Sequence, residues 1–220
     1  MLVATYNIQR GRGIDLTRDL DRTIELLASI DAEIVGLQEV VEEPGGPRGD
    51  QPRLIAESLG MSHVFQPARR LGRGHYGVAL LSRSPIASSA GIDLSIPRRE
   101  PRAAVHARIG TAEVFVCHFG LGPAERSQQV SRLRAVLRAA GPRRVVMGDF
   151  NEPGHGPVAR TLEAELGPRD LVLSHPALLP LFALDRIYSD AAVHGLRAHH
   201  TSVARVASDH LPVVAEIAAA

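Results

Sequence analysis

Polar side chains that could bind a cation or move a proton recur at or just beyond the ends of apolar segments in this 220-residue chain. An open α/β sheet ordinarily presents its ligand site at the ends of its strands. Carboxylates, amides and imidazoles together can position a water molecule, hold a hard cation and stabilise developing negative charge. The candidates are Asn7, Glu39, His118, Asp149, Asn151, Asp185, Asp209 and His210.

Most of these residues have an ordinary structural interpretation when each is taken alone. Glu39 could be a surface carboxylate at a strand end. Asp149 and Asn151 could belong to a turn in which a side chain accepts a backbone hydrogen bond. A lone His118 is more often a satisfied core histidine than a catalyst, and the pair 209–210 could cap an element. Only their joint occurrence favours a site.

Asp185 is the most informative residue when taken singly. It lies in the apolar segment Leu-Phe-Ala-Leu-Asp-Arg-Ile-Tyr, where a carboxylate pays a desolvation cost unless a partner offsets it. Arg186 is the ordinary partner but faces the other side of a strand. His210 is the partner that would make Asp185 functional.

The elements that must position these residues alternate along the chain, as in an α/β domain. We expect a single domain over residues 1–220, with a loop at 41–51 and an antiparallel region at 75–118. Predicted strands cover 2–8, 34–39, 77–81, 86–94, 103–109, 114–118, 145–150, 184–188 and 211–217. Predicted helices cover 19–30, 54–59, 158–166 and a segment that begins at Pro123 and ends before Gly141.

Composition limits the function classes. The 25 basic residues, all arginine, nearly balance 24 acidic ones, so the net charge of +1 gives no global attraction to nucleic acid or an anionic membrane. The absence of lysine excludes Schiff-base chemistry. Cys117 is the only cysteine, which excludes an intramolecular disulfide and a cysteine zinc cluster. Without a signal-peptide pattern or an apolar segment of about 18 residues, we expect a cytoplasmic protein with no transmembrane segment.

Other histidines and the arginine groups carry weaker signals. Histidines elsewhere in the chain, including His175, show no zinc-ligand spacing and are predicted to be surface or loop residues. The arginine groups at 69–73, 98–102 and 143–144 are predicted to be solvated. Arg102 is the exception, because it precedes a predicted strand and could reach a phosphate oxygen.

Taken in order, the motifs resemble those of the endonuclease/exonuclease/phosphatase superfamily, which includes deoxyribonuclease I, apurinic endonucleases, neutral sphingomyelinases and inositol polyphosphate 5-phosphatases. Two smaller features, at 76–83 and Glu100-Pro-Arg, resemble its compact bacterial hydrolases. The main motifs are Thr5-Tyr-Asn-Ile, Leu37-Gln-Glu-Val, His118-Phe-Gly-Leu, Gly148-Asp-Phe-Asn-Glu, Leu184-Asp-Arg-Ile-Tyr and Ser208-Asp-His-Leu-Pro.

The resemblance implies a four-layer sandwich of two packed mixed β-sheets flanked by helices. It implies that Glu39, Asn7 and Asp209 hold a metal ion. Oxygen ligands without sulfur independently suit Mg²⁺, with Mn²⁺ as the alternative. Gln9 stands where many nuclease relatives carry an acidic residue, so the number of ions, one or two, stays open.

The resemblance also implies catalytic roles. Asp149 would orient or deprotonate the attacking water, and Asn151 would hold that water or a phosphate oxygen. His210, oriented by Asp185, would stabilise charge on the phosphorus transition state, and His118 would bind a second phosphate oxygen.

The predicted function is therefore a Mg²⁺-dependent phosphoesterase that acts on a small or lipid-linked phosphodiester. Nucleic acid is the less favoured substrate, because tryptophan is absent and aromatic residues make up only 4% of the chain. The alternatives are a DNA endonuclease or exonuclease of the same superfamily, and a binding module that has lost catalysis. A metal-free serine hydrolase is disfavoured because no Gly-x-Ser-x-Gly turn is present. The sequence does not indicate an oligomeric state.

Overall fold

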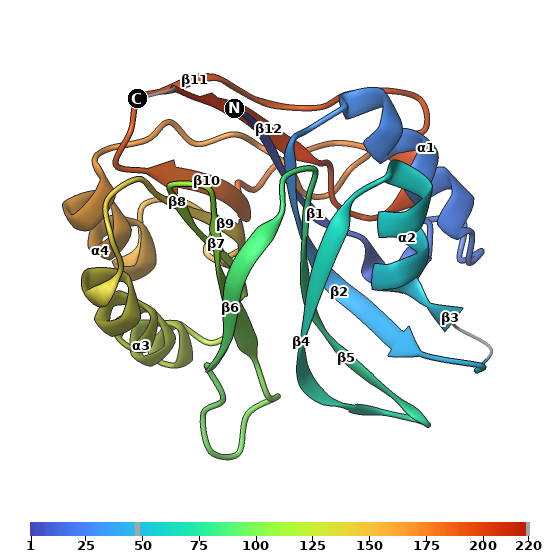
Figure 1. Cartoon of the computed structure of the whole chain (residues 1–220), viewed down its shortest axis with the longest axis horizontal. Coiled ribbons are helices and arrows are strands. Elements are labelled where there is room, and N and C mark those ends of the chain that lie inside the picture. The colour runs from blue at the N-terminus through green and yellow to red at the C-terminus, as the bar shows by residue number, and fades with distance from the viewer. Residues whose placement is uncertain (47–48, 219–220) are drawn as a thin grey trace.

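Two β-sheets pack face to face in the computed structural model, which describes residues 1–46 and 49–218 (Figure 1). The seven-stranded sheet has the order β11-β12-β1-β2-β5-β4, with β3 paired to β2. Its strands are β1 (Leu2–Asn7), β2 (Ile34–Glu43), β3 (Gly49–Asp50), β4 (Ser62–Leu71), β5 (Gly74–Ser82), β11 (Val193–Ala198) and β12 (Val213–Ile217).

The five-stranded sheet has the order β10-β9-β8-β7-β6. Its strands are β6 (Ile86–Asp93), β7 (Ala103–Ile109), β8 (Ala112–His118), β9 (Arg144–Asp149) and β10 (Asp185–Ser189). Both sheets are mixed, because β1 pairs with β2 and β8 with β9 in parallel, while the other pairs are antiparallel.

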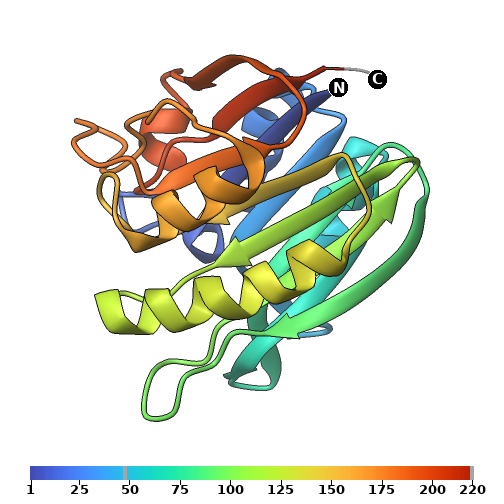
Figure 2. The same cartoon turned by 90° about the vertical axis from the view of Figure 1, so that its left-hand side faces the viewer.

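Helices cover the outer face of each sheet. The helices α1 (Leu20–Ile30) and α2 (Gln51–Leu59) lie on the seven-stranded sheet, and α3 (Pro123–Ala139) and α4 (Pro157–Leu166) lie on the five-stranded sheet (Figures 1 and 2). A short α5 (Ala204–Ala207) and the 3₁₀ turn η1 (Gln9–Gly11) complete the helical elements of the described chain. The predicted four-layer sandwich is confirmed.

The sequence explains where the helices begin. The Asp19 carboxylate accepts hydrogen bonds from the backbone N–H groups of Asp21 and Arg22 and so caps α1. Pro123 is the first residue of α3, as predicted, where its missing N–H costs no helical hydrogen bond.

Three apolar layers hold the sandwich together, one between the sheets and one beneath each helix pair. In the central layer the sheets approach so closely that a Cβ added at Gly36 would lie 2.9 Å from a methyl group of Val116. A close-packed interior of this kind fixes the relative position of the two sheets. The site described below depends on that position because both sheets contribute to it.

One predicted element was wrong in part, and two strands were missed. The strand β2 continues past Glu39 to Glu43, and β3 forms at 49–50, so both ends of the predicted loop at 41–51 are strand; residues 47 and 48 lie outside the described residues. The strands β4 and β11 were not predicted. Both are edge strands, which tolerate the proline and polar residues that hide the alternating pattern.

The antiparallel region predicted at 75–118 is confirmed as β5 to β8. Within the described ranges, no helix is both long enough and apolar enough to cross a membrane.

Candidate active site

A cleft of about 490 Å³ opens at the edge of the sandwich where several strand ends meet. The parallel strands β1, β8 and β9 end there, while β10 and the segment before β12 begin there because they run antiparallel to their neighbours. Seven of the eight predicted site residues line the cleft, and Asp185 lies behind His210. The seven are Asn7, Glu39, His118, Asp149, Asn151, Asp209 and His210.

Asp149 lies at the floor of the cleft and is 1% exposed. Its Oδ2 accepts a hydrogen bond from Asn7 Nδ2 at 3.0 Å, and its Oδ1 accepts one from the backbone N–H of Asn151 at 2.9 Å. The turn anticipated for Gly-Asp-Phe-Asn is thus present, and it fixes the carboxylate within the site. Burial disfavours the charged carboxylate and raises the pKa of Asp149 to about 6, although the positive charge of His210 acts in the opposite direction.

Glycine is required at position 148 because the neighbouring strand β8 lies so close. A Cβ at this position would lie 2.0 Å from the backbone oxygen of Cys117 on the neighbouring strand β8. No side chain can occupy that space, so the glycine of the motif permits Asp149 and His118 to stand side by side at the ends of paired strands.

Asp185 and His210 form the pair that the sequence suggested. The His210 Nδ1 lies 2.7 Å from Asp185 Oδ2, which also accepts a hydrogen bond from Ser174 Oγ at 2.6 Å. Burial disfavours the charged imidazole, but the nearby carboxylates outweigh that effect and raise the pKa of His210 to about 10. Arg186 instead forms an ion pair with the buried Glu152 at 3.6 Å.

Glu39 does not end its strand, which corrects the prediction. It sits at a bulge inside β2, where the register against β5 shifts between Leu37 and Val40, and its φ is +58°. The bulge turns the carboxylate into the cleft, where Arg10 Nε lies 3.7 Å from Glu39 Oε2.

His118 is buried in a cluster that the sequence only partly suggested. One Arg102 nitrogen lies within 3.2 Å of both ring nitrogens of His118, and the Tyr76 hydroxyl lies 3.4 Å from Nδ1. Burial, with the charge of Arg102 adding to it, lowers the pKa of His118 well below its usual value. Glu100 accepts a hydrogen bond from Arg102 at 2.9 Å. The motifs containing Tyr76 and Glu100 were noticed in the sequence, but no role was assigned to them.

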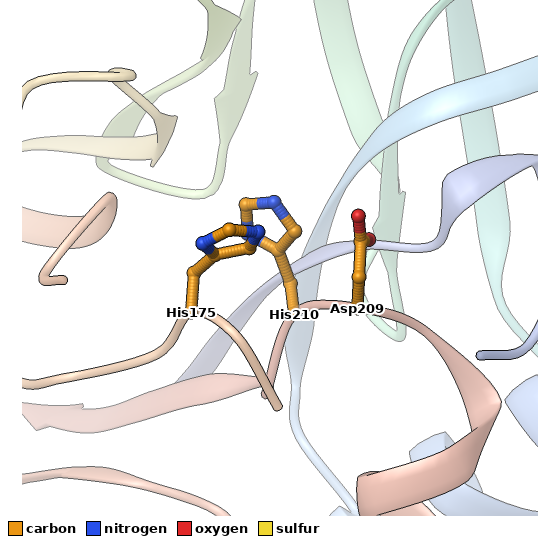
Figure 3. Close-up of side chains that lie close together, drawn as sticks. All are labelled: His175, Asp209 and His210. Carbon is orange, nitrogen blue, oxygen red and sulfur yellow. The ribbon is translucent and has the colours of Figure 1, made fainter. Parts of the chain in front are cut away.

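His175 lies in a loop, as predicted, but its place in the cleft was not foreseen. His175 lines the cleft, and its ring centroid lies 4.6 Å from that of His210. Figure 3 shows His175, His210 and Asp209 projecting in a similar direction from two neighbouring segments. No spacing in the sequence marks His175, because its position depends on contacts between segments far apart in the chain. Arg10 and Arg69 also line the cleft without having been predicted there.

Comparisons with known proteins identify the family. A model of the Endonuclease/Exonuclease/phosphatase family matches residues 4–210. The chain belongs to this family. Uncharacterized protein YbhP of Escherichia coli strain K12 is 27% identical over 241 residues, covering 98% of this chain and 95% of YbhP.

Two solved structures share the architecture of this chain. A functionally unknown conserved protein from Enterococcus faecalis V583 is 19% identical, with a TM-score of 0.81 and 99% of each chain covered. The mannosyl-6-phosphatase Bt3783 of Bacteroides thetaiotaomicron is 16% identical, with a TM-score of 0.70 and 99% of each chain covered. At these identities the similarity shows the fold. Hydrolases of the family act on phosphate esters and generally use a divalent metal ion.

The cleft contains acidic and histidine side chains that could hold such an ion. Ligand atoms of His175, Asp209 and His210 lie within 4.8 Å of one another, as do those of Asp149, Asp185 and His210. Both groups include His210, whose Nδ1 is already bound to Asp185. Mg²⁺ prefers oxygen donors, and Glu39, Asn7 and Asp209 supply carboxylate and amide oxygens in the cleft lining.

Neighbouring groups orient these oxygen donors. Gln9 Nε2 donates to Asp209 Oδ2 at 2.9 Å, and the Gln9 backbone N–H donates to Asn7 Oδ1 at 3.1 Å. Carboxylate and amide oxygens each have a second lone pair, so both residues can still face a cation. The residues therefore fit a hard divalent ion.

Proposed function

We propose that this chain is a divalent-metal-dependent phosphodiesterase that cleaves its substrate by attack of water on phosphorus. The observation that carries the proposal is the buried Asp149, held by Asn7 and Asn151, with His210 Nε2 only 3.9 Å from its Oδ2. A fixed carboxylate beside an imidazole that a second carboxylate orients can activate water and stabilise the charge that develops on phosphate oxygens.

Each side chain has a role in this proposal. Asp149 accepts the proton of the attacking water, and Asn151 holds that water or a phosphate oxygen. His210, fixed by Asp185, donates to a phosphate oxygen in the transition state. His118, supported by Arg102, binds a second oxygen.

Glu39, Asn7 and Asp209 are the proposed ligands of Mg²⁺, with Mn²⁺ as the alternative. When bound, the ion would neutralise charge on the phosphate oxygens.

The preferred substrate is a small or lipid-linked phosphodiester. Arg10, Arg69 and Arg102 supply positive charge at the cleft, whereas the chain as a whole carries only +1 and lacks tryptophan. Duplex binding commonly needs basic residues spread over several phosphates. A DNA endonuclease or exonuclease activity is the alternative.

The test is hydrolysis of bis-p-nitrophenyl phosphate and of p-nitrophenyl phosphate, each with Mg²⁺ and with EDTA. We expect Mg²⁺-dependent cleavage of the diester that Asp149→Asn abolishes. Full activity after exhaustive chelation would refute the metal dependence. A parallel assay on plasmid DNA and an abasic-site duplex tests the alternative, since efficient incision at low enzyme concentration would favour a nuclease.

A further inference from the structure

The segment between α4 and β10 exposes an unusual amount of apolar surface. Residues 171–184, here called the apolar loop, contain no acidic residue and no arginine. Of eight large apolar side chains exposed in the described chain, five lie in this loop: Leu173, Leu178, Leu179, Leu181 and Phe182. Clustered exposed apolar side chains mark an interaction surface rather than a random surface composition.

The apolar loop has a fixed backbone. His175 and Phe182 exchange backbone hydrogen bonds of 3.1 and 2.8 Å across the loop. The N–H of Ala177 donates to the backbone oxygen of Asp209 at 2.7 Å, and the N–H of Leu211 donates to that of Ser174 at 2.8 Å. The loop is therefore fastened to the segment that carries Asp209 and His210.

The loop is also continuous with the mouth of the cleft. His175 and Leu184, at either end of its tip, line the cleft, and the Phe182 ring centroid lies 6.4 Å from that of His175. Leu121, which is 71% exposed, lines the cleft as well. A molecule whose phosphate occupied the cleft would thus meet apolar side chains next to its phosphate group.

Arginine side chains line the cleft beside the carboxylates of Glu39 and Glu100, with which they pair, and they offer hydrogen-bond donors to phosphate oxygens. Arg10 and Arg69 are partly exposed in its lining, and Arg102 lies deeper beside His118. Positive side chains beside an uncharged apolar rim match an amphiphile that has a phosphodiester next to hydrocarbon.

We propose that the apolar loop docks on a lipid surface and so delivers the phosphodiester headgroup of a phospholipid to the cleft. This inference rests on the proposed function, whose substrate class it narrows. A protein partner or second copy seated on the loop would cover the mouth beside His175 and obstruct the substrate. A lipid surface instead brings the substrate to the mouth.

The first experiment measures binding without catalysis. The protein is sedimented in EDTA with vesicles of equimolar phosphatidylcholine and phosphatidylglycerol. We expect the triple variant Leu178→Asn, Leu179→Asn, Leu181→Asn to partition about 100-fold more weakly than the unmodified protein, because three apolar side chains no longer insert. The matched control is Leu16→Asn. Leu16 is 68% exposed, does not line the cleft and has φ of +65°, which asparagine tolerates.

The second experiment separates docking from chemistry. The triple variant should cleave soluble bis-p-nitrophenyl phosphate as fast as the unmodified protein but should release glycerol phosphate or diacylglycerol from phosphatidylglycerol vesicles at least about tenfold more slowly. Cleavage of the soluble diester without any cleavage of vesicle lipid would overturn the phospholipid assignment.

Binding and function can fail separately. Failure of the unmodified protein to sediment with vesicles, or equal sedimentation of the triple variant, would overturn docking and leave the phosphodiesterase proposal in place. Vesicle binding without hydrolysis of any phosphate ester would refute the proposed function but retain the lipid surface. A dimer in sedimentation velocity that the triple variant converts to a monomer would assign the loop to self-association instead.

Discussion

Two carboxylates face the cleft from opposite sheets, and they differ in exposure and in the contacts that hold them. Asp149, on the five-stranded sheet, is 1% exposed and accepts hydrogen bonds from Asn7 and Asn151. The Glu39 side chain, on the seven-stranded sheet, is 23% exposed and meets Arg10 at 3.7 Å. Its backbone also adopts a positive φ that a residue with a Cβ disfavours by about 1–2 kcal/mol.

The difference in exposure and contacts indicates that the protein itself fixes the Asp149 carboxylate, whereas the Glu39 carboxylate remains accessible to a ligand. The contacts around Asp149 are internal to the chain and hold it in one orientation. Glu39 is kept accessible on a strained bulge, an arrangement that persists in proteins where function requires it. We therefore expect substitutions at Asp149 to lower the catalytic rate directly. Substitutions at Glu39 should change the Mg²⁺ requirement, and substitution by glycine should relieve the backbone strain.

The largest effect is expected from Asp149→Asn. Loss of the proton acceptor should lower kcat/KM for bis-p-nitrophenyl phosphate by about 10⁴-fold, the upper end of what general acid–base catalysis contributes. The melting temperature should change little, because the variant removes a buried charge but also replaces one of the two oxygens that accept from Asn7 and Asn151 with an amide donor. Retention of more than about a tenth of the activity would mean that another group activates the water.

A smaller but more diagnostic loss is expected from the Asp185–His210 pair. His210→Ala and Asp185→Asn should each lower kcat by about 10²–10³-fold, and the double variant should lose little more than His210→Ala, because the two side chains act as one unit. A double-mutant cycle measured at saturating substrate checks this. Strictly additive losses would show that the 2.7 Å contact does not serve catalysis.

The Glu39→Gln variant should lower activity by about 100-fold at fixed Mg²⁺ and raise the Mg²⁺ concentration needed for half-maximal rate, since a neutral amide is a weaker ligand. Its circular dichroism spectrum should match that of the unmodified protein, because the fold is retained. Glu42→Gln is the matched control, because Glu42 lies on the same strand but outside the cleft lining. An insoluble Glu39→Gln protein would reassign Glu39 to a structural role.

The smallest effect concerns stability. Glu39→Gly should raise the free energy of unfolding in the absence of metal by about 0.5–1 kcal/mol, because glycine adopts positive φ without a Cβ clash. Glu42→Gly should lower it by a similar amount, since glycine in regular strand is unfavourable. Urea denaturation of both variants in EDTA checks the contrast, and equal destabilisation would argue that the Glu39 backbone carries no strain.

The sequence predicted the central strands better than the edges of the fold. The segments that became β1, β8 and β9 are apolar and end in a polar residue, so both their type and their orientation could be inferred. The edge strand β4 contains Pro67 and alternating polar residues, and the bulge at Glu39 has no glycine to mark it. Such features depend on neighbours in the sheet and leave little trace in local sequence.

Most site residues were predicted from the joint order of their motifs, and only one could be inferred singly from its surroundings. Asp185 stands out as a carboxylate in an apolar segment, and its partner His210 follows from that. His175 could not be found in this way, because a histidine beside a proline is ordinary in a loop. Its place in the cleft is set by hydrogen bonds from the loop to Asp209 and Leu211, which only the folded chain brings near.

The pairing of β1 with β12 has a consequence for synthesis on the ribosome. Residues 2–5 pair with residues 213–216, so the strand that ends in Asn7 lacks one neighbour until β12, about 200 residues later in the sequence, has emerged. Asp209 and His210 also arrive late. A nascent chain can therefore assemble the five-stranded sheet first, but its cleft forms only after the segment 209–217 has emerged. A chain that stopped before β12 would leave β1 with an open edge that invites aggregation, and one that stopped before Asp209 would also lack two residues of the cleft lining.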